Sequence, residues 1–335
     1  MNAPLNSIRI VEFEGIGPGP LAGRMLADMG AEVTVIARPG TANVADKLGA
    51  TPDGMRRGKR VVELNLKDPT HLAQAADLVA QADALIEGNR PGVMERLGLG
   101  PADLAERNPK LVYGRMTGWG QTGPLANAAG HDLNYVALTG ILALSAHRGQ
   151  KPIVPMGVVG DAAGALGRAF GIVSAVLDAR TSGQGRVVDA AIVDITTMLG
   201  GIARWVPGSD TIHDSPFYDV YACADGGYIT VGAIEPQFYA LLLIKLGLTD
   251  ADPAAQYDKA AWPKLKARMS AVFASQPRAH WCELLERSDV CFAPVLSVAE
   301  AEAHAHMAAR RAAAEADRSG VHPEAAPRFL PLQAR

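Results

Sequence analysis

Short apolar runs alternate with amphipathic stretches along the first 120 residues, and glycine or proline separates most of them. Residues 8–13 (IRIVEF) and 32–37 (EVTVIA) are typical of buried strands, whereas 21–31 (LAGRMLADMGA) has its apolar residues at helical spacing. A strand, a helix and a second strand form a βαβ unit, whose strands run parallel. Further strand-like runs follow at 60–66, 82–88 and 110–120. This pattern predicts an α/β fold, doubly wound around a parallel sheet.

The glycine turn after the first strand raises the question of a dinucleotide site. Gly15 and Gly17 begin a GxGxxG spacing, but the third glycine would stand at position 20, where the chain has Pro20. Arg38 ends the second predicted strand, where an NADP enzyme would hold the 2′-phosphate. Binding of NAD or NADP therefore stays open, although a tight strand-to-helix turn explains these glycines better.

A long helix is predicted to begin at Asp161 and to end at Gly183. The residues that follow Asp161 are small, which lets a ligand approach the backbone, and the N–H groups of a helix start favour an anion. An aspartate at this position is also a common N-cap. A catalytic role and a capping role for Asp161 are compatible.

The pattern changes after Pro207, Gly208 and Pro216. A hairpin is predicted around Asp225-Gly226-Gly227, followed by a helix that begins at Glu235-Pro236. We therefore expect a second, smaller α+β domain. The expected boundaries are a large domain at 1–190 with 305–335, a linker at 191–215 and the small domain at 216–304.

Composition and charge exclude several classes of protein. The chain has 335 residues, a formal net charge of -3 and 48% hydrophobic residues, which gives no global attraction to nucleic acid or to an anionic membrane. Its three cysteines, Cys223, Cys282 and Cys291, have no CxxC spacing, so we expect neither disulfides nor a metal site. No apolar stretch appears long enough to cross a bilayer, and a cytoplasmic location is expected.

Basic residues gather near the predicted strand ends. Such runs are usually solvated surface, but an acidic chain has little reason to concentrate them beside a ligand crevice. A phosphate-rich ligand is therefore a fair hypothesis. The residues concerned are Arg56, Arg57, Lys59, Arg60 and Arg90.

His131 is a candidate partner for Asp161. It precedes Asp132, which is itself a possible N-cap for the helix predicted from 133 onward, and alone it would pass for a loop histidine. Imidazole and carboxyl groups have ordinary pKa values of about 6.5 and 3.9, within tuning range of neutral pH. Together, His131 and Asp161 form a possible two-base site.

Several long motifs recur in order and carry a family resemblance. They include GHDLNY (130–135), VGD before a helix of small residues (159–161) and IEPQFY (234–239). From about Ile8 to Leu296 the chain resembles the α-methylacyl-CoA racemase branch of the family III CoA-transferase superfamily.

The resemblance implies an interlocked homodimer in which a large Rossmann-like domain binds coenzyme A and a small domain closes over the active site of the partner. His131 and Asp161 would be the two bases, and Glu235 would orient His131 from the other subunit. The residues expected around the coenzyme A are Ile16, Arg38, Lys59, Arg90, Gly130, Asp132 and Tyr135.

The implied reaction suits these residue types. Removal of a proton α to a thioester needs a positioned base and a stabilised enolate oxygen, for which the helix start at Gly160-Asp161 is a candidate. We expect an acyl-CoA substrate in which coenzyme A is the carrier, and no other cofactor or metal.

Two other functions remain open. Asp161 alone would serve a CoA-transferase as a nucleophile that forms an acyl anhydride. A catalytically silent acyl-CoA binding protein is the third possibility, to which Gly157 lends weight, because the racemases it resembles usually carry asparagine there. Arg168 is a second departure, in a region that these racemases keep glycine-rich and apolar.

Overall fold

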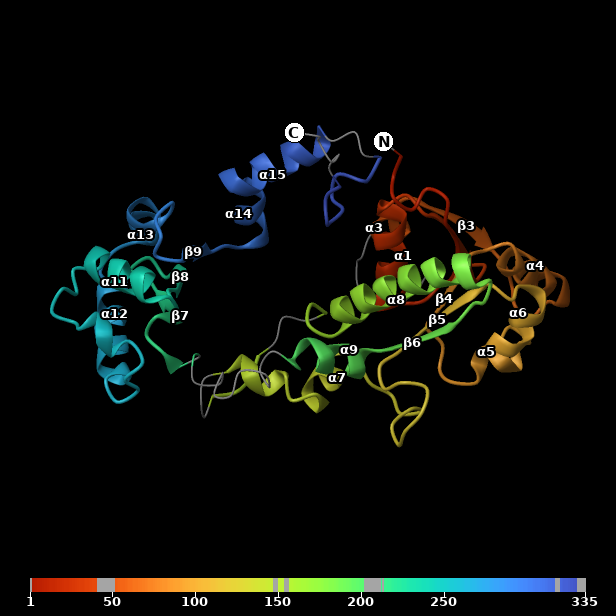
Figure 1. The fold of residues 1–335 in the computed structure, drawn as a ribbon, viewed down its shortest axis with the longest axis horizontal. Coiled ribbons are helices and arrows are strands. Elements are labelled where there is room, and N and C mark those ends of the chain that lie inside the picture. The colour runs from red at the N-terminus through yellow and green to blue at the C-terminus, as the bar shows by residue number, and fades with distance from the viewer. Residues whose placement is uncertain are drawn as a thin grey trace. The chain divides into compact units, whose positions relative to one another are not determined.

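The computed structural model describes residues 2–40, 52–146, 150–153, 157–201, 212, 214–316 and 320–329. The chain divides into two compact units, each with a sheet of its own (Figure 1). Unit 1 comprises Met1–Ser145, Ile153–Gly201 and Arg311–Arg335, and unit 2 comprises Ala146–Pro152 and Ile202–Arg310.

Unit 1 is built on a parallel sheet with the strand order β3-β2-β1-β4-β5-β6, and the register pairs Ile10 of β1 with Val33 of β2 and with Ala84 of β4. This is the doubly wound order. Strands are added on one side of β1 up to β3 and then on its other side from β4 onward, with all strands parallel. The α/β prediction is confirmed. The strands are β1 (Arg9–Phe13), β2 (Glu32–Ala37), β3 (Lys59–Glu63), β4 (Ala84–Glu87), β5 (Val112–Thr117) and β6 (Val187–Ala191).

Helices cover both faces of this sheet. One core joins Leu26 of α1 (Pro18–Asp28) and Ile172 of α8 (Asp161–Ser182) to one face, and a second core joins helix α4 (Pro69–Ala80) to the other. The remaining helices of this unit are α3 (Pro52–Arg56), α5 (Val93–Arg96), α6 (Pro101–Arg107), α7 (Asp132–Leu138), η1 (Leu142–Ser145) and α9 (Ile192–Leu199).

Helix α8, with 22 residues, has one face that is apolar and buried. Ala165, Ala169, Ile172 and Val176 recur every three or four residues and are buried, which explains why the helix lies on the sheet. By length and composition α8 is also apolar enough to cross a membrane, contrary to our expectation from the sequence, but 44% of the relevant window is buried inside the protein.

The first part of the expected linker at 191–215 is a helix. Residues Ile192–Leu199 form helix α9, which packs against α8 where Gly167 leaves room for Ile195; a Cβ on that glycine would lie 2.6 Å from the Ile195 side chain. The short apolar repeat of this helix follows strand β6 without a turn residue, which is why the sequence pattern hid it. Residues 202–211 and 213 of the expected linker lie outside the described residues.

Unit 2 contains an antiparallel sheet with the order β7-β8-β9. Strands β7 and β8 form the predicted hairpin, whose turn holds Gly226 at φ +78°. The strands are β7 (Tyr218–Ala222), β8 (Tyr228–Gly232) and β9 (Phe292–Val295). The helices are α11 (Pro236–Lys245), η3 (Pro253–Ala255), α12 (Trp262–Phe273), α13 (Arg278–Leu285), α14 (Val298–Ala303) and α15 (Ala305–Glu315), the last of which continues into unit 1.

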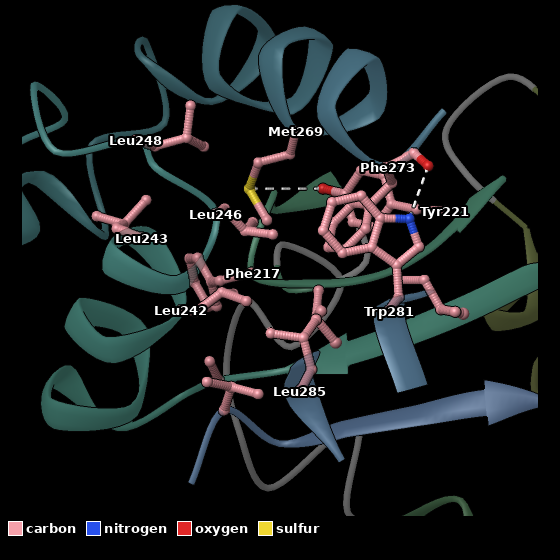
Figure 2. Close-up of a cluster of buried hydrophobic side chains, with 14 of the residues drawn as sticks. Phe217, Tyr221, Leu242, Leu243, Leu246, Leu248, Met269, Phe273, Trp281 and Leu285 are labelled. Atoms are coloured by element: carbon pink, nitrogen blue, oxygen red, sulfur yellow. Dashed lines mark hydrogen bonds between the residues drawn. The ribbon is translucent and has the colours of Figure 1, made fainter. Parts of the chain in front are cut away.

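A separate aromatic core holds unit 2 together (Figure 2). Phe273 packs between Tyr221 and Trp281, with ring centroids 4.9 and 5.1 Å away. The indole of Trp281 donates to the carbonyl of Phe273 at 2.9 Å, so its polar atom is satisfied. Leu242 and Leu243 anchor α11 in this core, which gives Glu235, at the start of that helix, a rigid support.

Candidate active site

The carboxylate of Asp132 joins the starts of α7 and α8. Its Oδ1 accepts hydrogen bonds from the backbone N–H of Asp161 at 2.8 Å and of Gly160 at 3.0 Å, and its Oδ2 accepts one from Gly157 at 3.0 Å. Because His131 directly precedes α7, these bonds bring His131 and Asp161 to one place although 30 positions separate them.

Asp161 does not cap its own helix. Gly160 occupies the N-cap position of α8, and the start of the helix has no side-chain cap, so the Asp161 carboxyl is left for other contacts. Burial raises the pKa of Asp161 to about 6; the charge of Asp132 adds to the increase and His131 opposes it. A carboxyl group in this range can accept or donate a proton near neutral pH.

His131 lies in extended backbone at φ -134° and is exposed. Its backbone N–H donates to Oδ1 of Asn134 at 3.1 Å, while its imidazole makes no capping bond. It lines a cavity of about 280 Å³ together with Asn89, Arg90 and Tyr135. The imidazole therefore lies beside a space that a small organic group can fill.

Gly130 and Tyr135 form part of the wall of this cavity, which is the smaller of two at the candidate active site. The Tyr135 hydroxyl donates to the carbonyl of Gly130, and its ring meets Trp119 edge to face at 4.7 Å. A Cβ at Gly130 would lie 2.7 Å from Tyr135 and 2.8 Å from Trp119, so only glycine fits. These contacts hold the chain in place just before His131.

A larger cavity of about 620 Å³ opens at the carboxyl ends of β1, β2 and β3. Ile16 and Arg38, which the resemblance places around coenzyme A, line it, and so do Lys67 and Arg96. Three cations around one cavity suit a ligand with several phosphates. Asn89 lines both cavities, so the two spaces are neighbours.

Neither Lys67 nor Arg96 was predicted from the sequence as a site residue. Lys67 directly follows the strand-like run predicted at 60–66, and Arg96 lies within the span of the chain, from about Ile8 to Leu296, that carries the resemblance. The position of Lys67 at a strand end was the available signal, because ligands of doubly wound folds bind there. Lys67 stands apart from the dense cluster of cations at Arg56 to Arg60, so the density of charge in the sequence did not indicate it.

Lys59 differs from the expectation, since it lines neither of these cavities. Its side chain is buried, its ammonium lies 2.7 Å from Oε2 of Glu12, and it donates to the carbonyl of Pro20 at 2.8 Å. Gly23 makes space for the pair, because a Cβ there would lie 1.8 Å from the Glu12 carboxylate. The reason is a buried acid in β1 that needs a counter-ion.

The other cations of that cluster also have protein partners. Arg56 pairs with Glu14, Arg57 pairs with Asp28 at 2.9 Å, and Arg60 donates to the hydroxyl of Thr34 at 3.2 Å. The cluster thus ties β3 and α3 to their neighbours. The candidates for phosphate binding are instead the cations that line the larger cavity, namely Arg38, Lys67 and Arg96.

Gly157 has a left-handed backbone, with φ +75°, and a Cβ there would meet no atom within 4 Å. Glycine and asparagine are the residues that adopt this conformation most readily. The departure at this position therefore needs no change of function. It also keeps the Gly157 N–H directed at Asp132.

The expected enolate cradle at Gly160-Asp161 is not available as described from the sequence. Both N–H groups donate to Asp132 instead. The physical reason is the close approach of the two helices, since a Cβ at Gly160 would lie 2.4 Å from Oδ1 of Asp132.

Arg168, the second departure, is fully buried two turns beyond Asp161. Its Nη2 donates to the carbonyl of Gly114 at 2.8 Å and to that of Glu87. Burial lowers the pKa of Arg168 to about 10, and the charges of Glu87 and Glu12 oppose that decrease. The guanidinium fastens α8 to the end of β4 and to the middle of β5.

Glu235 lies in unit 2, at the N-cap position of α11. Its carbonyl accepts from the N–H of Phe238 and of Tyr239, each at 3.0 Å, whereas its side chain is exposed and makes no cap bond. The carboxylate is therefore free of its own helix. Across the described parts of the chain, no group of three His, Cys, Asp or Glu side chains is placed to hold a metal ion.

Comparisons with known proteins agree with one another. Residues 5–333 match the family model described as CoA-transferase family III. The chain is 38% identical over 337 residues to alpha-methylacyl-CoA racemase of Homo sapiens, covering 97% of this chain and 86% of that protein. It is 40% identical over 314 residues to alpha-methylacyl-CoA racemase of Mus musculus, covering 90% and 80%. The crystal structure of Rv3272 from Mycobacterium tuberculosis matches with a TM-score of 0.77 at 29% identity, covering 92% of this chain and 86% of that one.

Proposed function

The chain belongs to CoA-transferase family III, and on that basis we propose that it is an isomerase that interconverts the (2R) and (2S) forms of 2-methylacyl-CoA thioesters. The observation that carries the proposal is the juxtaposition of His131 and Asp161 through Asp132. Two proton carriers at one place are what inversion of a carbon acid requires.

In this reaction one base removes the α-proton and the other returns a proton to the opposite face. The two groups must hold complementary protonation states, so that one is ready to accept while the other is ready to donate. Asp161, whose pKa is raised to about 6, can take either part near neutral pH. His131 takes the other part. The direction of the reaction decides which of the two groups accepts the α-proton and which donates one.

The developing enolate needs hydrogen-bond donors. Since Gly160 and Asp161 donate to Asp132, the start of α7 is the better candidate. For the N–H groups of Asp132 and Leu133, its first two residues, the described residues offer no hydrogen-bond partner. A thioester oxygen beside His131 would lie next to these donors.

The two neighbouring cavities suit the two ends of an acyl-CoA. Arg38, Lys67 and Arg96 line the larger cavity and would hold the phosphates. The pantetheine arm would then pass Asn89 into the smaller cavity beside His131. Coenzyme A enters this scheme as the carrier of the substrate.

We further propose that the protein acts as a homodimer. Four large apolar side chains are exposed along one stripe of α8, at the spacing i, i+4, i+7 and i+11, which suits packing against another protein surface. They are Leu166, Phe170, Val173 and Leu177, with exposed fractions of 58%, 74%, 40% and 68%. In such a dimer the partner subunit's Glu235 would orient His131 with its free carboxylate.

A CoA-transferase is the second candidate, and the free carboxyl of Asp161 is the observation that favours it. There Asp161 would attack the thioester carbonyl and form an acyl anhydride while the CoA thiolate leaves. A second base has little use in that reaction. The position of His131 beside Asp161 therefore favours the racemase.

One experiment separates the two candidates. Each enantiomer of a 2-methylacyl-CoA is incubated with the protein in deuterated water, with and without a free carboxylic acid. The racemase predicts deuterium at the α-carbon with loss of optical purity, regardless of the acid. Acid-dependent exchange of the acyl group and a hydroxylamine-sensitive adduct on Asp161 would instead establish the transferase. If neither reaction occurs, the protein is a catalytically silent acyl-CoA binder.

A further inference from the structure

Asp132 was expected to lie around the coenzyme A; its backbone N–H is a candidate donor to the thioester, but its carboxylate faces the protein. The residue is 6% exposed, and each of its carboxylate oxygens accepts from backbone N–H groups of the turn before α8. Its position between His131 and Asp161 suggests that it acts through these two groups.

The turn from Gly157 to Asp161 depends on this carboxylate for its place. Within the turn, the N–H of Ala162 donates to the carbonyl of Gly157 at 3.0 Å. The three bonds to Asp132 fasten the turn to α7, across 25 to 29 positions of sequence. Gly160 has no room for a side chain beside the carboxylate and Val136. The crowding at Gly160 and the three bonds to Asp132 leave the turn little freedom to shift.

From these contacts, we propose that Asp132 is a positioning residue, which holds the turn before α8 against α7 and so fixes His131 and Asp161 on either side of the substrate α-carbon. The role rests on the proposed racemase function, because it concerns the two bases of that reaction. In this role the Asp132 side chain positions the two bases, and the residues that line the two cavities bind the coenzyme A.

The charge of Asp132 has a second effect. Three charged or titratable groups on the α7 side face Asp161: Asp132, His131 and Tyr135. From the loop between β1 and α1, the residue in contact is Gly17, which carries no charge. After burial, Asp132 is the main influence that raises the pKa of Asp161, so its negative charge favours the protonated form. Removing the charge should lower that pKa.

Asp132→Asn tests both effects in the full-length protein. An amide oxygen in the place of Oδ1 can keep the bonds from Gly160 and Asp161, whereas the amide NH₂ meets the N–H of Gly157 as donor against donor. We expect kcat for α-deuterium exchange of a 2-methylacyl-CoA to fall about tenfold or more. The KM should stay within about twofold, because the cavity cations are untouched.

The pH profile separates this role from a merely structural one. Loss of the Asp132 charge should move the acid limb of kcat to lower pH, by about half a unit or more. A carboxyl ¹³C titration of Asp161 should show the same shift without any substrate. Asp68→Asn is the matched control, because Asp68 also accepts two backbone N–H bonds, at the start of α4, yet lies outside the site.

An unmoved limb and an unmoved ¹³C titration would overturn the proposal, even with a lowered kcat. If Asp132→Asn does not fold, Asp132→Glu takes its place; it keeps the charge but lengthens the side chain, so kcat should fall while the limb stays. Wild-type kcat in Asp132→Glu would contradict the positioning role. Absence of exchange in the wild-type protein would instead defeat the racemase function, and the ¹³C titration would still decide the effect of Asp132 on Asp161.

Discussion

Gly17 lies directly against the carboxylate of Asp161. A Cβ on Gly17 would stand 3.1 Å from Oδ2 of Asp161, and the glycine has a left-handed backbone with φ +68°. The glycine turn after β1 thus helps to shape the candidate active site, where it leaves room for a carboxyl group. The same turn had suggested a dinucleotide motif in the sequence.

Gly17→Ala should therefore lower racemisation about tenfold or more, because the new methyl group displaces the Asp161 carboxyl. Gly98→Ala is the matched control, since Gly98 has φ +69° and no atom within 4 Å of a Cβ. Both variants should lose about 1–3 kcal/mol of stability from backbone strain, and Gly17→Ala the more, because Gly17 has ψ -124°, outside the left-handed helical region. Steady-state kinetics and thermal unfolding measure the two effects. Equal activity in both variants would show that Gly17 serves the turn alone.

Replacement of Gly157 tests whether the missing asparagine matters. Gly157→Asn should keep kcat within about threefold of the wild type, because asparagine tolerates φ +75° and the position has open space. Gly157→Val should reduce kcat strongly, since a β-branched residue at positive φ would shift the turn that donates to Asp132. A large gain of activity in Gly157→Asn would mean that the asparagine has a role beyond backbone shape.

The cavity cations give a prediction about coenzyme A. Lys67→Ala and Arg96→Ala should each raise the KM for the acyl-CoA about five- to twentyfold, a moderate effect because exposed cations are screened by water and salt. The effect should shrink with dephospho-CoA substrates if the residue holds the removed phosphate. An unchanged KM in both variants would place the phosphates elsewhere.

Lys59→Met should behave differently, as a stability variant. It leaves Glu12 buried without its counter-ion, at a cost of about 3 kcal/mol. Burial already raises the pKa of Glu12 from 4.5 to about 7, and a group with a raised folded-state pKa loses stability as pH rises through that range. Loss of Lys59 should raise the pKa of Glu12 further, so urea unfolding between about pH 5 and about 9 should show a deficit that grows as the pH rises above about 7. If Lys59→Met has wild-type stability but binds CoA weakly, Lys59 is a ligand-binding residue and not a structural one.

The stripe on α8 predicts the oligomeric state. Phe170→Glu places a charge at the centre of the apolar stripe and should weaken the proposed dimer about a hundredfold or more. Ser182→Glu adds the same charge at an exposed position at the end of the same helix, on another face than the stripe. Sedimentation over a range of concentrations measures both. A monomeric wild type, or a Phe170→Glu dimer as tight as the control, would remove α8 from the interface.

The sequence pattern predicted the elements whose signal is local. Alternating apolar runs with glycine turns indicated the strands β1 to β5, and Asp225-Gly226-Gly227 indicated the hairpin of unit 2. The start of α8 at Asp161 followed from the small residues after it. The family motifs singled out His131 and Asp161, which the fold brings together.

Long-range partners were beyond the reach of such patterns. The bonds from Asp132 to the turn before α8 span up to 29 positions, and no spacing rule connects them. Lys59 looked like a ligand residue because its buried partner, Glu12, lies 47 positions earlier in β1. Burial decides whether a charge meets solvent or another charge, and burial is a property of the folded core.

The most direct test of the two-base assignment follows deuterium into each enantiomer separately, with Asp161→Asn and with His131→Ala. Each variant keeps one base, so each should lose racemisation while still exchanging the α-proton of one enantiomer, and the two variants should act on opposite enantiomers. Racemisation at the wild-type rate in either variant, or exchange of the same enantiomer by both, would contradict the account.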